Sequence, residues 1–126
     1  MIGYVTLGTN DLERAASFYD ELLSLMGAGR FMDEGTFIAW AVSPDVPAIL
    51  VTKPYDGKAA TVGNGTMVAL AVKTTEQVDA IHAKALELSG TDEGAPGPRG
   101  DSGFYAGYFR DLDGNKLNAF CMTQPA

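Results

Sequence analysis

The segment GFYAGYFRDLDGNKLNAFC, which spans Gly103–Cys121, decides the fold of this 126-residue chain because it predicts a β-hairpin. Two extended runs, Phe104–Arg110 and Lys116–Cys121, flank a short polar turn. Within that turn, the Asp113-Gly114 pair permits the positive φ angles that a tight reversal of the chain requires. We therefore predict two antiparallel strands that are connected at this pair.

A weaker copy of this hairpin occurs earlier in the chain. Shifting the sequence by 68 residues places Gly103 on Gly35, and the register continues through four further pairs. These pairs are Tyr108 with Trp40, Asp113 with Asp45, Leu117 with Ile49, and Asn118 with Leu50. In this copy, a Pro-Asp turn at residues 44–45 separates two extended runs, Thr36–Val42 and Pro47–Lys53. The hairpin is therefore predicted twice.

The segments before the two hairpins repeat as well. Residues 1–8 alternate as a strand, and Asn10 with Glu13 fits a capping box at the start of an amphipathic helix that Gly27 and Gly29 end. A short strand around residues 30–32 follows. Shifting by 63 residues places Tyr4 on Met67 and carries the pattern onto a second strand and a second helix at about residues 75–89.

The combined pattern predicts a single α+β domain of two tandem βαβββ modules. The first module covers about residues 1–55, a connector about residues 56–65, and the second module about residues 66–123. Because the shift grows from 63 to 68, the second module holds five extra residues before its hairpin. They fall in Thr91–Ser102, whose GAPGPRG core is expected to be a loop.

The composition narrows the class of partner. The net charge of −7 repels nucleic-acid phosphates and anionic lipids, so we expect neither nucleic-acid nor membrane binding and favour a cationic or neutral small molecule. Because Cys121 is the only cysteine, no intrachain disulfide can form. The sequence begins with a strand-like segment rather than an apolar leader, and we therefore expect a cytoplasmic protein.

Two motifs carry a resemblance to a known family. TLGTNDLERAASFYDELL near the start and RDLDGNKLNAF near the end, set in tandem βαβββ modules, resemble the vicinal oxygen chelate superfamily. This superfamily includes glyoxalase I, extradiol dioxygenases, fosfomycin-resistance enzymes and bleomycin-resistance proteins. The resemblance covers essentially the whole chain, and Leu112 replaces the proline of the usual DPDGN motif. It implies curled mixed sheets that form a cup with the active site on its floor, and it implies a homodimer.

The resemblance also implies where a metal would be bound. Metal-dependent members hold a divalent cation with four side chains, one from the first and one from the last strand of each module, which are His, Gln or Glu. The repeat places these positions at Tyr4, Met67, Leu50 and Asn118. A divalent ion needs anionic oxygen or imidazole donors, and Met67 and Leu50 supply neither. The Tyr4 phenolate and the Asn118 carbonyl make at most a poor two-ligand site. We therefore predict that the usual metal centre is absent, and we expect no cofactor.

Three other features that suggest chemistry have simpler structural interpretations. His82, the only histidine, falls on the second predicted helix, where a surface or packed position is typical. The acidic turn that begins at Asp111 starts like an EF-hand loop, but Lys116 and Met122 stand where that loop needs glycine and glutamate. Cys121 lies in an apolar strand with no basic neighbour, which indicates a buried, inert thiol.

What the cup offers is an aromatic and polar lining for an organic ligand. Strand alternation places Tyr4 with Thr6 on one face, and Lys116 with Asn118 and Phe120 on another. The candidate ligand-binding residues are Tyr4, Thr6, Trp40, Leu50, Met67, Arg99, Tyr108, Lys116, Asn118 and Phe120. For each strand aromatic, the alternative interpretation is a position in the core, and for Arg99 it is a solvent-exposed position in a loop.

Three functions fit these observations. The favoured one is a metal-free protein that binds or sequesters a small organic molecule, as the bleomycin-resistance members do. The second is a glyoxalase-like lyase or isomerase that uses Tyr4 and Lys116 as an acid–base pair, although free Tyr and Lys titrate only at about pH 10. The third is a non-catalytic dimerisation module with an occluded cup.

Overall fold

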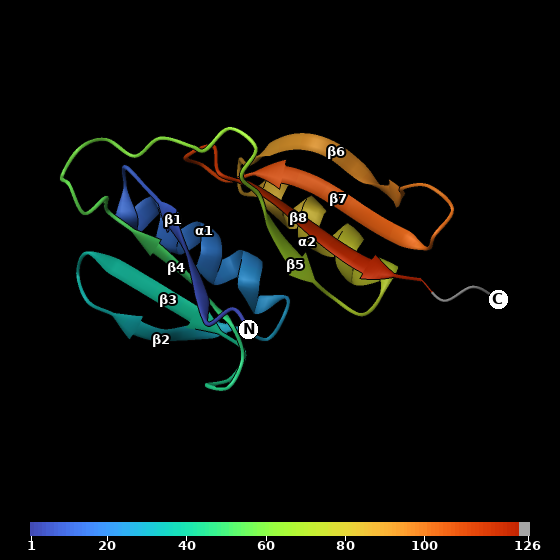
Figure 1. Cartoon of the computed structure of the whole chain (residues 1–126), viewed down its shortest axis with the longest axis horizontal. Helices are drawn as coiled ribbons and strands as arrows, with labels where there is room; N and C mark the ends of the chain where they lie inside the picture. Colours follow the sequence, from blue (N-terminus) through green and yellow to red (C-terminus); the bar gives the residue numbers. More distant parts are fainter. Residues whose placement is uncertain (124–126) are drawn as a thin grey trace.

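The computed structural model describes residues 1–123, and within them the chain forms two βαβββ modules in succession (Figure 1). The first module contains β1 (Tyr4–Gly8), α1 (Leu12–Ser24), β2 (Gly29–Asp33), β3 (Phe37–Ala41) and β4 (Ala48–Thr52). The second contains β5 (Val68–Ala71), α2 (Thr75–Glu87), β6 (Thr91–Pro98), β7 (Phe104–Arg110) and β8 (Lys116–Met122). The predicted α+β fold is confirmed, and the decisive hairpin is β7–β8.

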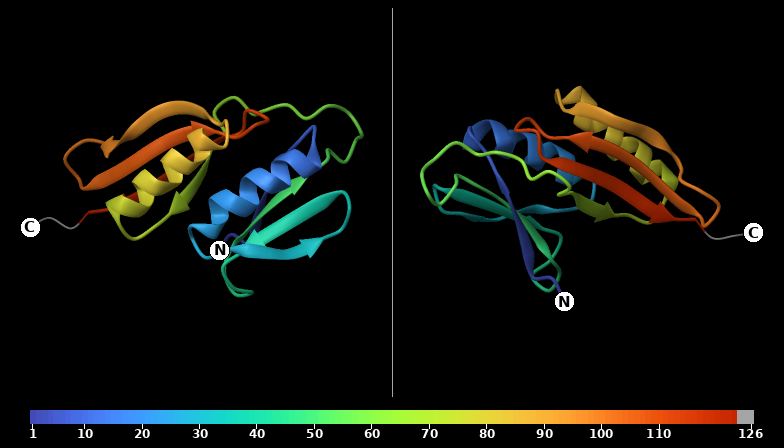
Figure 2. Two further views of the ribbon diagram at one scale, coloured as in Figure 1. Left: turned by 180° about the vertical axis from the view of Figure 1, so that it is seen from behind. Right: turned by 45° about the horizontal axis from the view of Figure 1, so that its top comes forward.

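Each module forms its own four-stranded mixed sheet. The strand order is β1-β4-β3-β2 in the first sheet and β5-β8-β7-β6 in the second, so the first and last strands of a module pair in parallel at the same side of the sheet. Both helices lie on the same side of the two sheets (Figure 2). One face of each sheet is therefore covered by its helix, and the opposite face is open. No helix in the described part of the chain is both long and apolar enough to cross a bilayer.

The start of α1 differs from the predicted capping box. Asp11 is the N-cap, and its carboxylate accepts a hydrogen bond from the Arg14 amide at 3.1 Å. Asn10, one residue earlier, instead holds the connector, because its side-chain oxygen accepts from the Ala60 amide at 2.7 Å and its amide nitrogen donates to the Ala60 carbonyl at 3.2 Å. The prediction that Asn10 caps the helix was therefore wrong by one residue.

The second helix begins at a true capping box. Thr74 accepts a hydrogen bond from the Gln77 amide, and the Gln77 side chain reaches back to the Thr74 amide. Its buried face packs on β7 and β8 and includes His82, which is only 6% exposed. The predicted packed or surface histidine is a packed one, and its Nε2 lies 3.0 Å from Asp92.

The segment that was expected to be a loop contains a strand. β6 runs over Thr91–Pro98 and pairs antiparallel with β7, with register shifts between Asp92 and Gly94 and between Gly94 and Gly97. The expectation failed because glycine and proline were taken to exclude a strand. β6 is the edge strand of its sheet, where bulges occur and where a proline without an amide hydrogen is tolerated.

The β7–β8 turn connects the second module to the first. The Tyr19 hydroxyl of α1 donates to the Asp111 carboxylate at 2.6 Å, and both residues are buried. Asn115 donates to the Gly8 carbonyl at 2.9 Å, and Asp113 accepts from the Asn10 amide at 2.9 Å. Burial, together with the neighbouring Asp111 carboxylate, raises the pKa of Tyr19, so the phenol stays protonated and donates. This turn fixes how the modules are joined.

Candidate ligand-binding face

The open face of the second sheet is defined by strand alternation. Along β8, Leu117, Ala119 and Cys121 belong to the core beneath α2, so Lys116, Asn118 and Phe120 point to the other face. On the neighbouring strand, Tyr108 lies opposite Asn118, and Ala106 opposite Phe120. The predicted sharing of one face by Lys116, Asn118 and Phe120 is therefore present in the structure.

Two cationic side chains approach the ring of Tyr108 on this face. The guanidinium carbon of Arg99 lies 5.4 Å from the ring centroid, and the Lys116 ammonium lies 5.6 Å from it, which are cation–π distances. Arg99 is anchored by donating to the carbonyls of Ala95 at 2.7 Å and Gly97 at 2.9 Å. The segment that carries Arg99 thus folds back over the sheet and delivers a positive charge to Tyr108.

Asn118 lies between the cationic residues and the apolar end of the face. Its side chain is 1% exposed, and its Oδ1 atom is buried without a hydrogen-bond partner among the described residues. Leaving a buried amide oxygen without a partner costs about 1–3 kcal/mol. A cost of this kind in a folded protein calls for an explanation.

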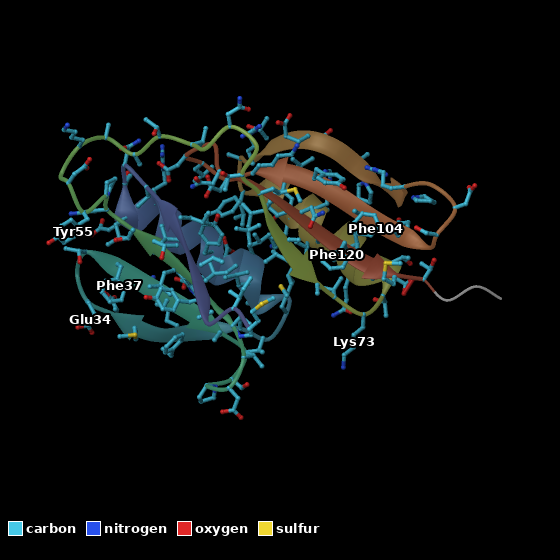
Figure 3. The ribbon with its side chains drawn as sticks, viewed as in Figure 1. Glu34, Phe37, Tyr55, Lys73, Phe104 and Phe120 are labelled. Carbon is cyan, nitrogen blue, oxygen red and sulfur yellow. The ribbon has the colours of Figure 1, made fainter. Side chains whose placement is uncertain are left out.

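An aromatic pair forms the other end of the face. The rings of Phe104 and Phe120 are stacked with centroids 5.5 Å apart and planes 25° apart. Both project from the second sheet in Figure 3. Sequence reasoning missed Phe104, although it lies four residues before Tyr108 on the same strand and therefore on the same face. We refer to Arg99, Phe104, Tyr108, Lys116, Asn118 and Phe120 as the aromatic–cationic face.

The candidate residues of the first module lie on a different sheet. Tyr4 is 64% exposed, and Thr6 pairs with Leu50 on the open face of the first sheet. No Cα atom of β1 or β4 lies within 8 Å of a Cα atom of β5 or β8. No hydrogen bond joins Tyr4 to Lys116 in residues 1–123, so the acid–base pair considered for an enzyme is not assembled within one chain.

The four positions implied for a metal are likewise divided between the two sheets. Tyr4 and Leu50 belong to the first sheet, whereas Met67 immediately precedes β5 and Asn118 lies in β8. One chain does not bring all four together, because each module closes its own sheet. A phenol, an aliphatic chain, a thioether and an amide also do not fit a hard or borderline cation. Residues 1–123 contain no group of three His, Cys, Asp or Glu side chains arranged to hold a metal ion.

Trp40 occupies the covered side of its sheet. It pairs with Ile49, whereas Tyr108 pairs with Asn118, so the two aromatics are not equivalent and the predicted pairing is corrected by one residue. The Trp40 side chain is 1% exposed, contacts the Tyr19 ring at 5.7 Å and donates to Asp20 at 2.8 Å. Trp40 is therefore a core residue, which was the alternative considered from the sequence. The 68-residue shift aligned it with Tyr108 because the shift does not account for the one-residue difference between the two hairpins.

Two cavities of about 520 Å³ each adjoin these elements. The first is apolar and lies between the modules, where Val5 and Ile49 face Val68 and Leu70, with the Trp40 ring in its wall. Sequence reasoning did not identify it. The second is polar and lies between the connector and the second sheet. Its lining comprises Val62, Gly63, Asn64, Gly65, Thr66, Met67, Arg110 and Lys116.

Comparison with known proteins agrees with the fold. The chain belongs to the Glyoxalase/Bleomycin resistance protein/Dioxygenase superfamily, whose family model matches residues 1–119. No curated protein matches it. A glyoxalase/bleomycin resistance protein from Albidiferax ferrireducens T118 is similar, with 37% identity, 99% coverage of both chains and a TM-score of 0.88.

More distant structures share the fold alone. A lactoylglutathione lyase from Agrobacterium tumefaciens has 19% identity, coverage of 96% of this chain and 92% of that one, and a TM-score of 0.70. The genomically encoded fosfomycin resistance protein FosX from Listeria monocytogenes has 15% identity, coverage of 98% and 93%, and a TM-score of 0.71. Their different activities show that membership of the superfamily does not by itself assign a reaction.

Proposed function

We propose that this protein binds a small organic molecule on the aromatic–cationic face, without a metal ion. The observation that carries the proposal is Asn118, whose buried amide oxygen has no partner on the open face of a sheet. The stacked phenylalanines and the Tyr108 ring supply apolar surface on either side of it. Apolar walls with a few polar groups between them are typical of small-molecule sites.

We further propose that a second copy of the chain covers the open faces. Ile2, Val42 and Met67 are 58%, 50% and 40% exposed, and all three border the apolar cavity between the modules. β1 and β5 are edge strands of their sheets, so the cavity lies at two unpaired edges. An apolar patch at such edges favours association. A cytoplasmic location is part of this proposal, since the single cysteine, Cys121, is buried and free.

The proposal is tested on protein purified from its own cells. Denaturation followed by mass spectrometry is expected to release one small molecule in a fixed ratio to the chain, and metal analysis is expected to find none in that ratio. A stoichiometric divalent ion that is lost on Asn118→Ala would contradict the metal-free site. Turnover of the adduct of methylglyoxal with glutathione would favour a lyase instead.

The dimer is tested by sedimentation. Val42→Glu is expected to convert dimer to monomer, because it places a charge beside the apolar cavity. Leu86→Glu, an equally charged change on the exposed side of α2, is the control and is expected to leave the dimer intact. A wild-type protein that sediments as a monomer would rule out the covering copy.

A further inference from the structure

Two cations on the aromatic–cationic face have no acidic partner. Arg99 and Lys116 are each partly buried, and neither forms an ion pair with an acidic side chain within residues 1–123. The other lysines that lack an acidic partner there, Lys53, Lys58 and Lys73, are exposed to solvent. Acidic residues outnumber basic ones by 16 to 9 in this chain, so counter-ions are plentiful elsewhere. Arg110, which lies opposite Lys116 in the β7–β8 ladder, is paired with Glu93 at 2.7 Å, whereas Arg99 and Lys116 have no carboxylate partner among the described residues, and this difference calls for a physical reason.

The arginine is held in place by the backbone rather than by a charge. Its guanidinium donates to two carbonyl groups of β6, and these neutral acceptors leave the positive charge uncompensated. Gly94 and Gly97 make room for it, because a Cβ atom built on either would stand 3.4 Å or 3.3 Å from a guanidinium nitrogen. The cation is thus positioned in advance of any ligand, which lowers the entropy cost of binding.

The lysine contributes a mobile charge on the other side. Its ammonium lies over the Tyr108 ring and also borders the polar cavity at the connector. Lys116 and Asn118 are two residues apart on one strand, which separates them by about 7 Å. A shift of the flexible lysine stem therefore opens the way to the buried amide without moving the backbone.

The apolar end lies at a defined distance from these charges. Phe120 is two residues beyond Asn118 and four beyond Lys116, which corresponds to about 7 Å and about 13 Å along the strand. The stacked Phe104 ring widens this end. A molecule with a charged head and a ring two or three bonds away matches the shorter spacing of about 7 Å, from the level of Tyr108 and Asn118 to Phe120, whereas a purely polar ion leaves the phenylalanines uncovered.

We infer that the aromatic–cationic face recognises an organic carboxylate, with its anionic head beside the cations that approach the Tyr108 ring, Arg99 and Lys116, and its apolar body on Phe104 and Phe120. This inference rests on the proposed function and narrows its ligand. An anionic ligand is the opposite of the cationic or neutral ligand that the net charge suggested. A partly buried cation close to the ligand has a larger electrostatic effect on binding than distant carboxylates that solvent and salt screen.

The test uses three probes of one shape: 3-phenylpropionate, its neutral amide 3-phenylpropanamide, and the cation 3-phenylpropylamine. Calorimetry on the intact wild-type protein at neutral pH is expected to show the carboxylate binding at least about tenfold more tightly than the amide. The amine is expected to bind most weakly. Added salt is expected to weaken only the carboxylate among the bound probes.

Substitutions then locate the charge. Lys116→Met, a partly exposed site that tolerates an apolar chain, is expected to weaken the carboxylate about fivefold or more and the amide less than about twofold. Lys73→Met makes the same change in net charge at an exposed position and is expected to change neither. An equal effect of both lysine variants would overturn the site, since it would show a response to overall charge only.

The remaining outcomes separate this inference from the proposed function. Equal or tighter binding of the amide or the amine would overturn the carboxylate and leave small-molecule binding in place. Absence of binding by all three probes would overturn the carboxylate class. The molecule released from the native protein then tests the proposed function. Release of an amine or a neutral compound supports small-molecule binding, and the absence of any bound molecule contradicts it.

Discussion

The two modules share one architecture, but their hairpin turns do different work. The β3–β4 turn of the first module, residues 42–47, is exposed throughout. The corresponding β7–β8 turn buries Asp111 and Asn115 against the start of α1. The helices differ in the same sense: Tyr19 bonds across to the other module, whereas His82, at the equivalent position, bonds to Asp92 of its own. The two modules thus share one backbone fold, but only the turn of the second module is buried against the other module.

The open faces diverge as well. The first sheet presents Tyr4, Thr6 and Leu50, and no candidate cation accompanies them. The second sheet carries two cations, a buried amide and a stacked aromatic pair. The polar candidate residues are therefore concentrated in the second module, whereas the first contributes Val5, Ile49 and Trp40 to the apolar cavity between the modules.

The largest effect is expected at the buried turn. Asp111→Ala removes the acceptor for the Tyr19 hydroxyl, for the Asp113 and Asn115 amides and for the Asn115 side chain. The free energy of unfolding is expected to fall by about 3–5 kcal/mol, measured by urea denaturation. Asp45→Ala, in the exposed turn, is the matched control and is expected to cost less than about 0.5 kcal/mol. Similar losses in both variants would refute the contrast between the turns.

Removal of a single bond between the modules is expected to cost less. Tyr19→Phe keeps the ring and deletes the hydroxyl that donates to Asp111, so we expect a loss of about 1–3 kcal/mol.

This variant also has a signature in its pH dependence. Because the pKa of Tyr19 is raised in the folded state, its contribution is complete below the unfolded pKa of about 10 and is lost as pH rises through the folded value. The wild-type protein is therefore expected to lose stability in alkali more steeply than Tyr19→Phe. Parallel stability curves above that pH would show that the phenol is not coupled to the turn.

A change in the core of the first module separates stability from binding. Trp40→Phe deletes the indole N–H that donates to Asp20 and part of the buried ring. We expect a loss of about 1–2 kcal/mol in stability and less than about a twofold change in the affinity for 3-phenylpropionate. Tyr108→Leu, which changes the aromatic–cationic face, is the converse variant and is expected to weaken the binding of 3-phenylpropionate. A strong binding defect in Trp40→Phe would place the ligand against the first module.

The smallest effect is expected at the rim of the contact between the modules. Arg14 lies 3.6 Å from Asp113, but its side chain is 49% exposed. The Asp113 side chain is only 3% exposed but keeps the Asn10 amide as a donor, so Arg14→Met is expected to lower the free energy of unfolding by about 0.5–1 kcal/mol. A loss as large as about 3 kcal/mol would show that the Arg14–Asp113 ion pair, rather than the buried hydroxyl, joins the modules.

The fold was accessible from the sequence because local patterns and the repeat agreed. The Asp113-Gly114 turn and the alternation around it fixed β7 and β8, and the helices followed from apolar spacing. The βαβββ pattern required a strand where β6 lies, but its extension through residues 94–98 was missed, because glycines and prolines are tolerated at an edge and edge position is a property of the assembled sheet. The strand faces of Lys116, Asn118 and Phe120 followed from alternation.

Other parts of the candidate site depend on the tertiary structure. The position of Trp40 did not follow from the repeat, because the two hairpins differ by one residue in register. The approach of Arg99 to Tyr108 depends on how a bulged strand folds back, and the burial of Asn118 depends on its neighbours. The division of Tyr4 and Asn118 between separate sheets likewise reflects how the modules pack, which a repeat pattern does not encode.

The bond between Tyr19 and Asp111 joins residues that are 92 positions apart, which has a consequence for synthesis on the ribosome. N-terminal segments leave the ribosome first and begin to fold before the rest of the chain exists. Until the β7–β8 turn emerges, the Tyr19 hydroxyl of α1 and the Asn10 amide just before α1 lack their partners in that turn, and the nascent first module is correspondingly less stable. Completion of the fold is therefore set by the last hairpin to be translated rather than by the first helix.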